Sequence, residues 1–360
     1  MATIYDVANL AEVSAKTVSR VLNNDGPVSK ETRKVVEAAI VKLGYVPSSA
    51  ARMMRSNHSG LVGLITGAIS MSPEPNQPAG LPELFIVQGI QKALASSGMT
   101  LMIADTGGTV EKAAALIDTF LRHRVEGLIY VAEYHQKVTL PRISGRTPIV
   151  LANCFDDRGT PAIVPDDHRG QHDLVARIID AGHRRIGYLT LSPEIAAGPL
   201  RRDGYRTALA EAGIGYDPDL VENCDLEGRD GEISILWEAI DRMLRLANPP
   251  TVFCCGNDKM ALRVYGILRS MGRKVPNEVS VAGYDNYRVI AETLFPPLTT
   301  ADLPYTAMGV RAAQRLMAII SGESPEDKGP TLVAGPVHWR ESVTDLRPAN
   351  VSKLKSVKEE

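Results

Sequence analysis

From residue 61 onward, short apolar runs alternate with longer amphipathic stretches. The apolar runs have the length of buried strands, and the clearest are residues 61–66, 100–105, 125–132, 148–153, 186–191, 250–256 and 279–285. The stretches with helical periodicity are residues 84–97, 111–123, 170–181, 202–212, 231–246 and 259–271. Strands that alternate with helices form parallel sheets covered by helices on both faces. This alternation predicts an α/β body of two doubly wound lobes, a fold that binds ligands at the carboxyl ends of its strands.

The first 46 residues carry the capping signals of three short helices. Thr3 and Asp6 form a capping box for the first helix, Ser14 is placed to cap a second over residues 15–23, and Ser29 caps a third. Two short helices with a three-residue connection, the second exposing small and hydrogen-bonding residues, are typical of an all-α helix-turn-helix head. The residues expected on that exposed face are Ala15, Lys16, Ser19, Arg20 and Asn23.

The charges are unevenly distributed along the chain. Residues 1–58 carry eight Lys and Arg side chains against five Asp and Glu, whereas the whole chain has a formal net charge of −2. A basic head on an acidic body favours a polyanionic partner for the head alone. The alternative is a three-helix bundle that packs against another protein. The expected outer face of the second helix argues against it, because that face lacks the mixed Glu and Lys of a solvated surface.

Resemblance to a known family begins with the segments TIYDVA at residues 3–8 and VSAKTVSRVLN at residues 13–23. These segments resemble the head of the lactose-repressor/galactose-repressor (LacI/GalR) family, and the match continues to Pro47. The resemblance implies that Ala15, Lys16 and Arg20 read bases in the major groove of DNA. The residues it implies at the backbone phosphates are Thr3, Tyr5, Ser14, Thr17, Ser19, Asn23, Ser29 and Tyr45.

Residues 47–59 link this head to the body. Composition alone favours a flexible tether, since so short a segment is not a stable helix in water. In the family that the chain resembles, this segment becomes a hinge helix on DNA and wedges an apolar side chain into the minor groove. The matching wedge is Met54, where leucine is usual in the family, and Ser48 and Ala51 are the other DNA contacts implied.

The body resembles the same family in the segments PIVL at 148–151, AGHRRI at 181–186, GND at 256–258, VSVAGYD at 279–285 and PLTT at 297–300. The resemblance implies a periplasmic-binding-protein-like body over residues 60–345 and a homodimer. Lobe one is expected at about 60–157 and 290–322, and lobe two at about 158–289 and 323–345, with crossings near 155–162, 287–292 and 320–330. Residues 346–360 are expected to be a disordered tail, whose lack of leucine heptads argues against a tail coiled coil.

Three polar residues are the main candidates for an effector pocket. Arg201, Asn257 and Asp285 follow or end predicted strands, and a donor fork, an amide and a carboxylate suit a ligand rich in hydroxyl groups. Simpler roles stay open: a surface ion pair for Arg201, a turn for Asn257 and a cap for Asp285. The further positions aligned with the pocket are Glu83, Asn153, Leu226 and Tyr305.

Two features leave the identity of the effector open. Leu226 stands where several sugar-responsive relatives place an aromatic ring, and residues 69–82 form a proline-containing loop that is longer than usual. The resemblance implies a repressor that a mono- or disaccharide, or a glycoside, releases from its operator. A nucleobase effector or a co-repressor mechanism is the alternative.

Other function classes find little support in the sequence. It contains no GxGxxG after a strand, no GxxxxGK[ST], no GxSxG and no HExxH, so we expect neither an enzyme nor a bound cofactor or metal. Cys154, Cys224, Cys254 and Cys255 lack ligand spacing, and the last two are expected on opposite faces of one strand. We found no secretory signal and no membrane-spanning run, so a cytoplasmic location is expected rather than that of a secreted solute-binding protein.

Overall fold

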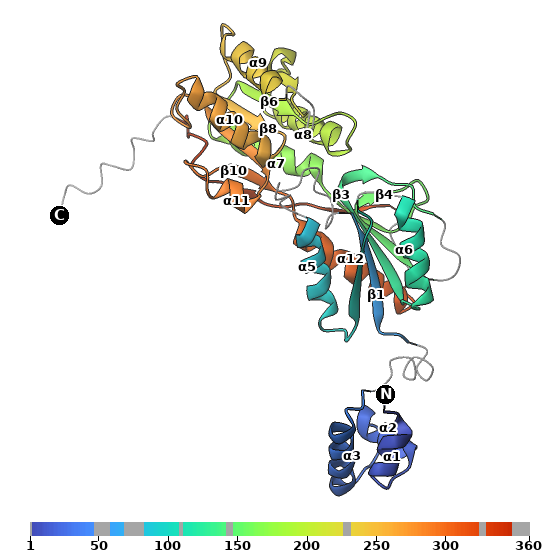
Figure 1. The fold of residues 1–360 in the computed structure, drawn as a ribbon. Helices are drawn as coiled ribbons and strands as arrows, with labels where there is room; N and C mark the ends of the chain where they lie inside the picture. Colours follow the sequence, from blue (N-terminus) through green and yellow to red (C-terminus); the bar gives the residue numbers. More distant parts are fainter. Residues whose placement is uncertain are drawn as a thin grey trace, which may run out of the picture. The chain divides into compact units, whose positions relative to one another are not determined.

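The computed structural model describes residues 2–46, 58–67, 83–107, 111–141, 147–225, 232–323 and 329–347, with the backbone alone at 83, 111 and 232. The chain divides into two compact units, residues 1–61 with 124–126 and residues 62–123 with 127–360 (Figure 1). The first unit contains the helical head. The second is an α/β body built around two sheets. The expected linker contacts Ser48, Ala51 and Met54, the loop at 69–82 and the tail from 348 onward lie outside the described residues.

The head contains the three helices expected from the caps: α1 (Ile4–Leu10), α2 (Ala15–Asn23) and α3 (Lys30–Leu43). One apolar side chain from each helix, Val7, Val18 and Val36, is fully buried in a shared core. The αL residue Asn24 ends α2 and the αL residue Gly44 ends α3, the conformation that closes many helices. The two helices of the predicted motif are therefore held by capping and by a small core.

Lobe one of the body is a sheet with the strand order β11-β5-β4-β3-β1-β2. Its strands are β1 (Leu61–Thr66), β2 (Thr100–Asp105), β3 (Gly127–Lys137), β4 (Ile149–Phe155), β5 (Ala162–Pro165) and β11 (Thr331–Val333). Val62 and Leu64 pack with α5 (Glu83–Leu94) and α12 (Tyr305–Ile320), which lie side by side (Figure 1). Gly63, between them on the strand, faces Phe120 of α6 (Glu111–Arg122). Helices therefore cover both faces of this parallel sheet.

Lobe two repeats this arrangement with the strand order β12-β10-β9-β8-β6-β7. Its strands are β6 (Ile186–Thr190), β7 (Val221–Asn223), β8 (Val252–Cys255), β9 (Ser280–Asp285), β10 (Thr299–Asp302) and β12 (Val337–His338). Cys254 packs in the core under α7 (Asp167–Asp180) and α8 (Ala197–Glu211). Cys255 packs in the opposite core, under α9 (Glu232–Leu244) and α10 (Asp258–Ser270). The expected placement of this cysteine pair on two faces is confirmed.

The chain changes sheets later than the sequence suggested. It leaves lobe one after β5 ends at Pro165, returns after β10 ends at Asp302, and leaves again after β11 ends at Val333. The expected crossings near 155–162, 287–292 and 320–330 each precede the observed ones. Strands β5, β10 and β11 have four, four and three residues, too few to show a periodicity of their own. No helix in the described part of the chain is long and apolar enough to cross a membrane.

Candidate functional site

The helix-turn-helix is built on the predicted caps. The backbone N–H of Thr3 donates to Asp6 Oδ2 at 2.7 Å, and the N–H of Asp6 donates back to Thr3 Oγ1 at 3.3 Å. The Thr3 hydroxyl also donates to Asp6 Oδ2 at 2.7 Å, and the hydrogen bonds that this carboxylate accepts from the Thr3 hydroxyl and backbone N–H lower the pKa of Asp6. Ser14 Oγ accepts from the N–H of Thr17 at 3.1 Å at the start of α2. The capping box and the second cap are confirmed.

A residue not singled out by the sequence fixes the far end of α2. Arg33 of α3 donates from Nη1 to Asn24 Oδ1 at 2.6 Å and to the Val21 carbonyl oxygen at 3.3 Å. Because Val21 and Asn24 lie at the end of α2, this guanidinium holds the second helix of the motif against the third. Such support limits the motion of the face that α2 presents to a partner.

The outer face of the motif largely agrees with the prediction. Tyr5 is 69% exposed, Lys16, Arg20 and Asn23 are exposed, and Ala15 and Thr17 are half-buried. Ser19 differs, since it is 9% exposed and its Oγ accepts from Asn23 Nδ2 at 3.3 Å. Its neighbours Val18 and Val21 draw this part of the helix toward the head core. The remaining predicted contacts are exposed at Thr3, Ser14 and Ser29 and half-buried at Tyr45.

Arg201 lies in lobe two and is buried, not at the surface as the simpler interpretation allowed. It sits in the second turn of α8, a helix that begins five residues before the predicted stretch. Its Nε donates to Asp167 Oδ1 at 2.7 Å, and its Nη1 donates to the Gly256 carbonyl oxygen at 2.6 Å. The guanidinium also stacks 3.6 Å from the centre of the Tyr284 ring. These partners hold the planar group in one orientation.

Asp285 ends β9 beside this guanidinium. Its Oδ1 lies 3.7 Å from Arg201 Nη1, and its side chain is 25% exposed. The backbone φ of Asp285 is 113°, a value that residues other than glycine rarely adopt. Strain of this kind is concentrated at functional sites, where the surrounding structure imposes it. The arginine and the carboxylate predicted for the pocket are therefore brought together, with the carboxylate open to solvent.

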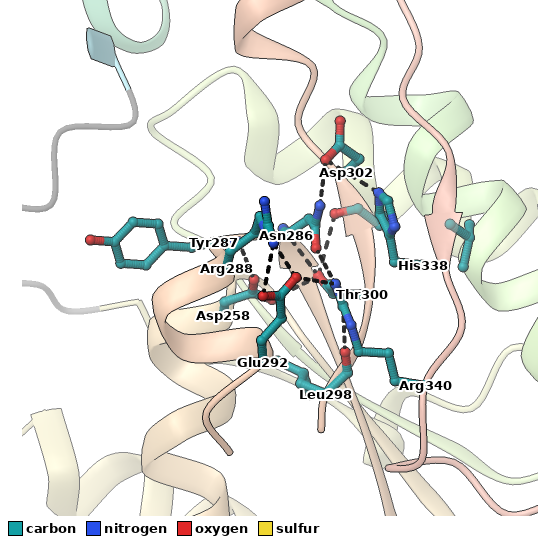
Figure 2. A network of polar contacts seen from close by, with 12 residues as sticks. Asp258, Asn286, Tyr287, Arg288, Glu292, Leu298, Thr300, Asp302, His338 and Arg340 are labelled. Carbon is teal, nitrogen blue, oxygen red and sulfur yellow. Dashed lines mark hydrogen bonds and ion pairs between the residues drawn. The ribbon is translucent and has the colours of Figure 1, made fainter. Parts of the chain in front are cut away.

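A network of polar contacts holds the turn that follows Asp285 (Figure 2). Asp258 accepts from the Thr300 hydroxyl through Oδ1 and from the Tyr287 N–H through Oδ2, each at 2.7 Å. Burial, and next the charge of Asp285, raise the pKa of Asp258 well above its ordinary value. Neither Asp258 nor Thr300 was predicted. Their contacts join the start of α10 to β10 and to the turn.

Arg340 ties the same turn to β10. It donates from Nη2 to Asn286 Oδ1 and from Nη1 to the Leu298 carbonyl oxygen, each at 2.8 Å. Asn286 in turn donates from Nδ2 to Asp302 Oδ1 at 2.8 Å. The Tyr287 ring points away from this network in Figure 2. The strained Asp285 is thus followed by Asn286, whose side chain is hydrogen-bonded to both Arg340 and Asp302.

A cavity of about 730 Å³ opens beside Asp285. Lobe two contributes Asp285 and Tyr287 to its lining, and lobe one contributes Phe85 and Tyr305. Tyr305 is the first residue of α12 and also packs against the cores of both lobes. A cavity of this size holds a small organic ligand. The cavity brings together two of the predicted pocket residues, Asp285 and Tyr305.

The remaining pocket candidates lie elsewhere or are not described. Asn257 caps α10, and its Oδ1 accepts from the Met260 N–H at 2.7 Å, which matches the local role considered for it. Asn153 lies in β4 of lobe one with a φ of 60° and is 1% exposed. Its Nδ2 donates to the Ala132 carbonyl oxygen, while its Oδ1 has no partner among the described residues. The side chain of Glu83 and all of Leu226 lie outside the described residues.

A helix-turn-helix head and a two-lobed body with a ligand-sized cavity at the strand ends define a ligand-responsive DNA-binding protein. Comparison with known proteins agrees with both parts. The profile of bacterial regulatory proteins of the lacI family matches residues 3–48, and that of a periplasmic binding protein-like domain matches residues 175–343.

Two curated relatives align with nearly the whole chain. The ribose operon repressor of Haemophilus influenzae is 29% identical over 96% of this chain and 100% of its own. The transcriptional repressor PurR of Vibrio campbellii is 32% identical over 91% of this chain and 95% of its own.

Solved structures show the same fold. A complex of the transcriptional regulator CelR with cellobiose is 30% identical, covers 95% of this chain and 100% of its own, and has a TM-score of 0.62. The lac repressor dimer bound to operator is 24% identical, covers 95% of this chain and 99% of its own, and has a TM-score of 0.74. The chain belongs to the LacI family of bacterial regulators. It is therefore a transcriptional repressor that binds operator DNA and a small effector, and it is not an enzyme.

Proposed function

We propose that the chain represses transcription until a small carbohydrate binds beside Arg201 and Asp285 and releases it from DNA. The observation that carries the proposal is the pairing of these two groups at 3.7 Å at the edge of lobe two. A guanidinium donates and a carboxylate accepts, so together they satisfy neighbouring hydroxyl groups, each of which does both. Similarity to a ribose operon repressor and to a CelR–cellobiose complex supports the same ligand class.

A nucleobase is the second candidate, and one observation favours it. The rings of Phe85, Tyr287 and Tyr305 line the cavity, and aromatic rings stack on flat bases as well as on sugar faces. The similarity to the repressor PurR, whose name points to purines, is compatible with this second candidate. Carbohydrate stays the first choice because the Asp285 carboxylate lines the cavity as an acceptor for hydroxyl groups, with the Arg201 guanidinium next to it.

Calorimetry on the full-length protein with d-ribose, cellobiose and purine bases would test the effector class. We expect a sugar to bind and Asp285→Asn to weaken its binding strongly, since the amide removes the negative charge and replaces one of the two acceptor oxygens with a donor. Asp203→Asn, at a carboxylate that is 62% exposed on α8, is the matched control and should bind normally. Binding of a purine base with no sugar binding would favour the second candidate.

We propose that a two-fold dimer reads a pseudo-palindromic operator, with Ala15, Lys16 and Arg20 of each subunit contacting one half-site. Met54 would then wedge into the minor groove, although it lies outside the described residues. Met54→Ala should reduce both operator affinity and DNA bending, measured by FRET, and leave effector affinity unchanged. Equal bending by the variant and the wild type would instead support the alternative, in which residues 47–59 are a flexible tether.

The same proposal sets the sign of the coupling between the two sites. If the effector weakens operator binding, operator must weaken effector binding by the same factor. Titrating the effector with and without operator DNA measures this factor. Tighter effector binding in the presence of operator would instead make the ligand a co-repressor.

A further inference from the structure

Asp167 is a buried carboxylate between the two lobes. It is the first residue of α7, two residues after β5 ends in lobe one, and its side chain is fully buried. Its Oδ1 accepts from Arg201 Nε at 2.7 Å, and its Oδ2 lies 2.7 Å from His135 Nδ1. Burial would raise the pKa of Asp167, but the charge of Arg201 and the contact with His135 outweigh it, so the pKa is lowered. Both oxygens of an ionised group are therefore occupied.

The second partner comes from the opposite lobe. His135 belongs to β3 of lobe one, in the segment where the pairing with β4 shifts register between Val131 and Gln136. Its side chain is 6% exposed and meets the edge of the Phe155 ring. An ionised carboxylate only accepts hydrogen bonds, so the proton of this contact resides on His135 Nδ1. The bulge in β3 thus delivers one N–H donor from lobe one to a buried acid of lobe two.

The contact between His135 and Asp167 is linked to the proposed effector site through Arg201. Arg201 is shared between Asp167 on one side and Asp285 on the other, and the distances are 2.7 Å and 3.7 Å. A change in the relative position of the lobes alters the distance from His135 to Asp167. Asp167 then loses a hydrogen bond, and an unsatisfied carboxylate oxygen in a buried site raises the free energy of the protein. The guanidinium is the only other group bonded to Asp167 side-chain oxygens among the described residues, so it takes up the change.

We propose that His135 is a positioning residue of the effector site: by holding the second oxygen of Asp167 from lobe one, it makes the placement of Arg201 depend on the approach of the lobes. This inference rests on the proposed function of Arg201 in binding the effector. Effector binding at Arg201 and the approach of the lobes are then coupled through the hydrogen bonds from Arg201 to Asp167 and from Asp167 to His135. The group that transmits the change is the imidazole N–H of His135, which is not among the residues that line the cavity beside Asp285.

The test measures the separation of the lobes directly. Nitroxide labels at Ala115→Cys on α6 and Glu238→Cys on α9 report that distance in the full-length dimer, diluted with unlabelled subunits. Both positions are exposed, whereas the four native cysteines are buried, so labelling is selective. The variants are His135→Leu, which removes the donor, and His135→Asn, whose amide N–H lies near the place of Nδ1. His172→Leu is the matched control, because its partners Asp173 and Glu211 both belong to lobe two.

We expect His135→Leu to shift and broaden the distance distribution, and His135→Asn and His172→Leu to retain that of the wild type. With cellobiose or d-ribose as probe, His135→Leu should lose roughly fivefold or more in affinity, and His135→Asn should recover most of it. An unchanged distribution in His135→Leu, or an asparagine variant as impaired as the leucine variant, would overturn the inference. If the wild type binds neither sugar, the proposed ligand class fails, while the distance measurements still decide the role of His135.

Discussion

The strained backbone at Asp285 makes a stability measurement a test of function. Asp285→Gly and Asp285→Ala both remove the carboxylate that lies 3.7 Å from Arg201, so both should lose effector binding. They differ only in the Cβ atom, which glycine lacks, so glycine adopts a φ of 113° without the steric cost that a Cβ imposes. Comparing the two variants therefore isolates the strain at this residue from the loss of its side chain.

The expected difference follows from two opposing effects. A non-glycine residue held in a sparsely populated region costs about 1–3 kcal/mol, and glycine relieves that cost. Glycine also makes the unfolded chain more flexible, which costs about 0.4–1 kcal/mol relative to alanine. Asp285→Gly should thus be more stable than Asp285→Ala by roughly 1 kcal/mol. For a unit of about 300 residues, that corresponds to a difference in Tm of roughly 1.5 °C.

Thermal and urea denaturation of the full-length protein, at equal subunit concentrations, would measure the difference. Asp203 supplies the control, since it lies within α8 with an exposed side chain. At Asp203 the sign reverses, because glycine is about 1 kcal/mol less favourable than alanine inside a helix. A glycine variant at Asp285 that is no more stable than the alanine variant would refute the argument that the site stores backbone strain.

Three further predictions test other parts of the molecule. Arg20→Ala should weaken operator binding by about 1–3 kcal/mol and relax the preference at one base pair, measured by titration of operator variants; a uniform loss across all variants would assign Arg20 to a phosphate instead. Gly309→Ala should lower the free energy of unfolding by roughly 1–3 kcal/mol, because a Cβ there would lie 2.0 Å from the Ile86 carbonyl oxygen. Gly266→Ala is the control, because a Cβ there meets nothing within 4 Å and should not destabilise the protein. Burial lowers the pKa of His183, so the unfolded chain takes up a proton more readily as the pH falls below about 6.5, and the stability due to the neutral ring is lost. His183→Gln should therefore flatten the dependence of urea midpoints on pH between about 7.5 and 5.5, and an equal slope in both proteins would contradict this assignment.

Local interactions explain why the head could be predicted in detail. Each cap joins residues three apart, as Thr3 with Asp6 and Ser14 with Thr17, so the donor and the acceptor are visible in one short segment. The buried position of Ser19 was missed. Its environment depends on how tightly α2 packs in the head core, and α3 contributes to that packing through Arg33.

The sequence by itself determined the class of fold, because the alternation of apolar runs and helical stretches requires sheets covered on both faces, and it placed Cys254 and Cys255 on opposite faces. It also marked Arg201 and Asp285 as pocket residues. Only the tertiary structure decided what surrounds them. Asp167 reaches Arg201 from 34 residues earlier in the chain, and His135 reaches Asp167 from 32 residues earlier, across the two lobes. No periodicity or cap encodes a contact between residues so far apart, because it exists only once strands and helices from both lobes have been packed together.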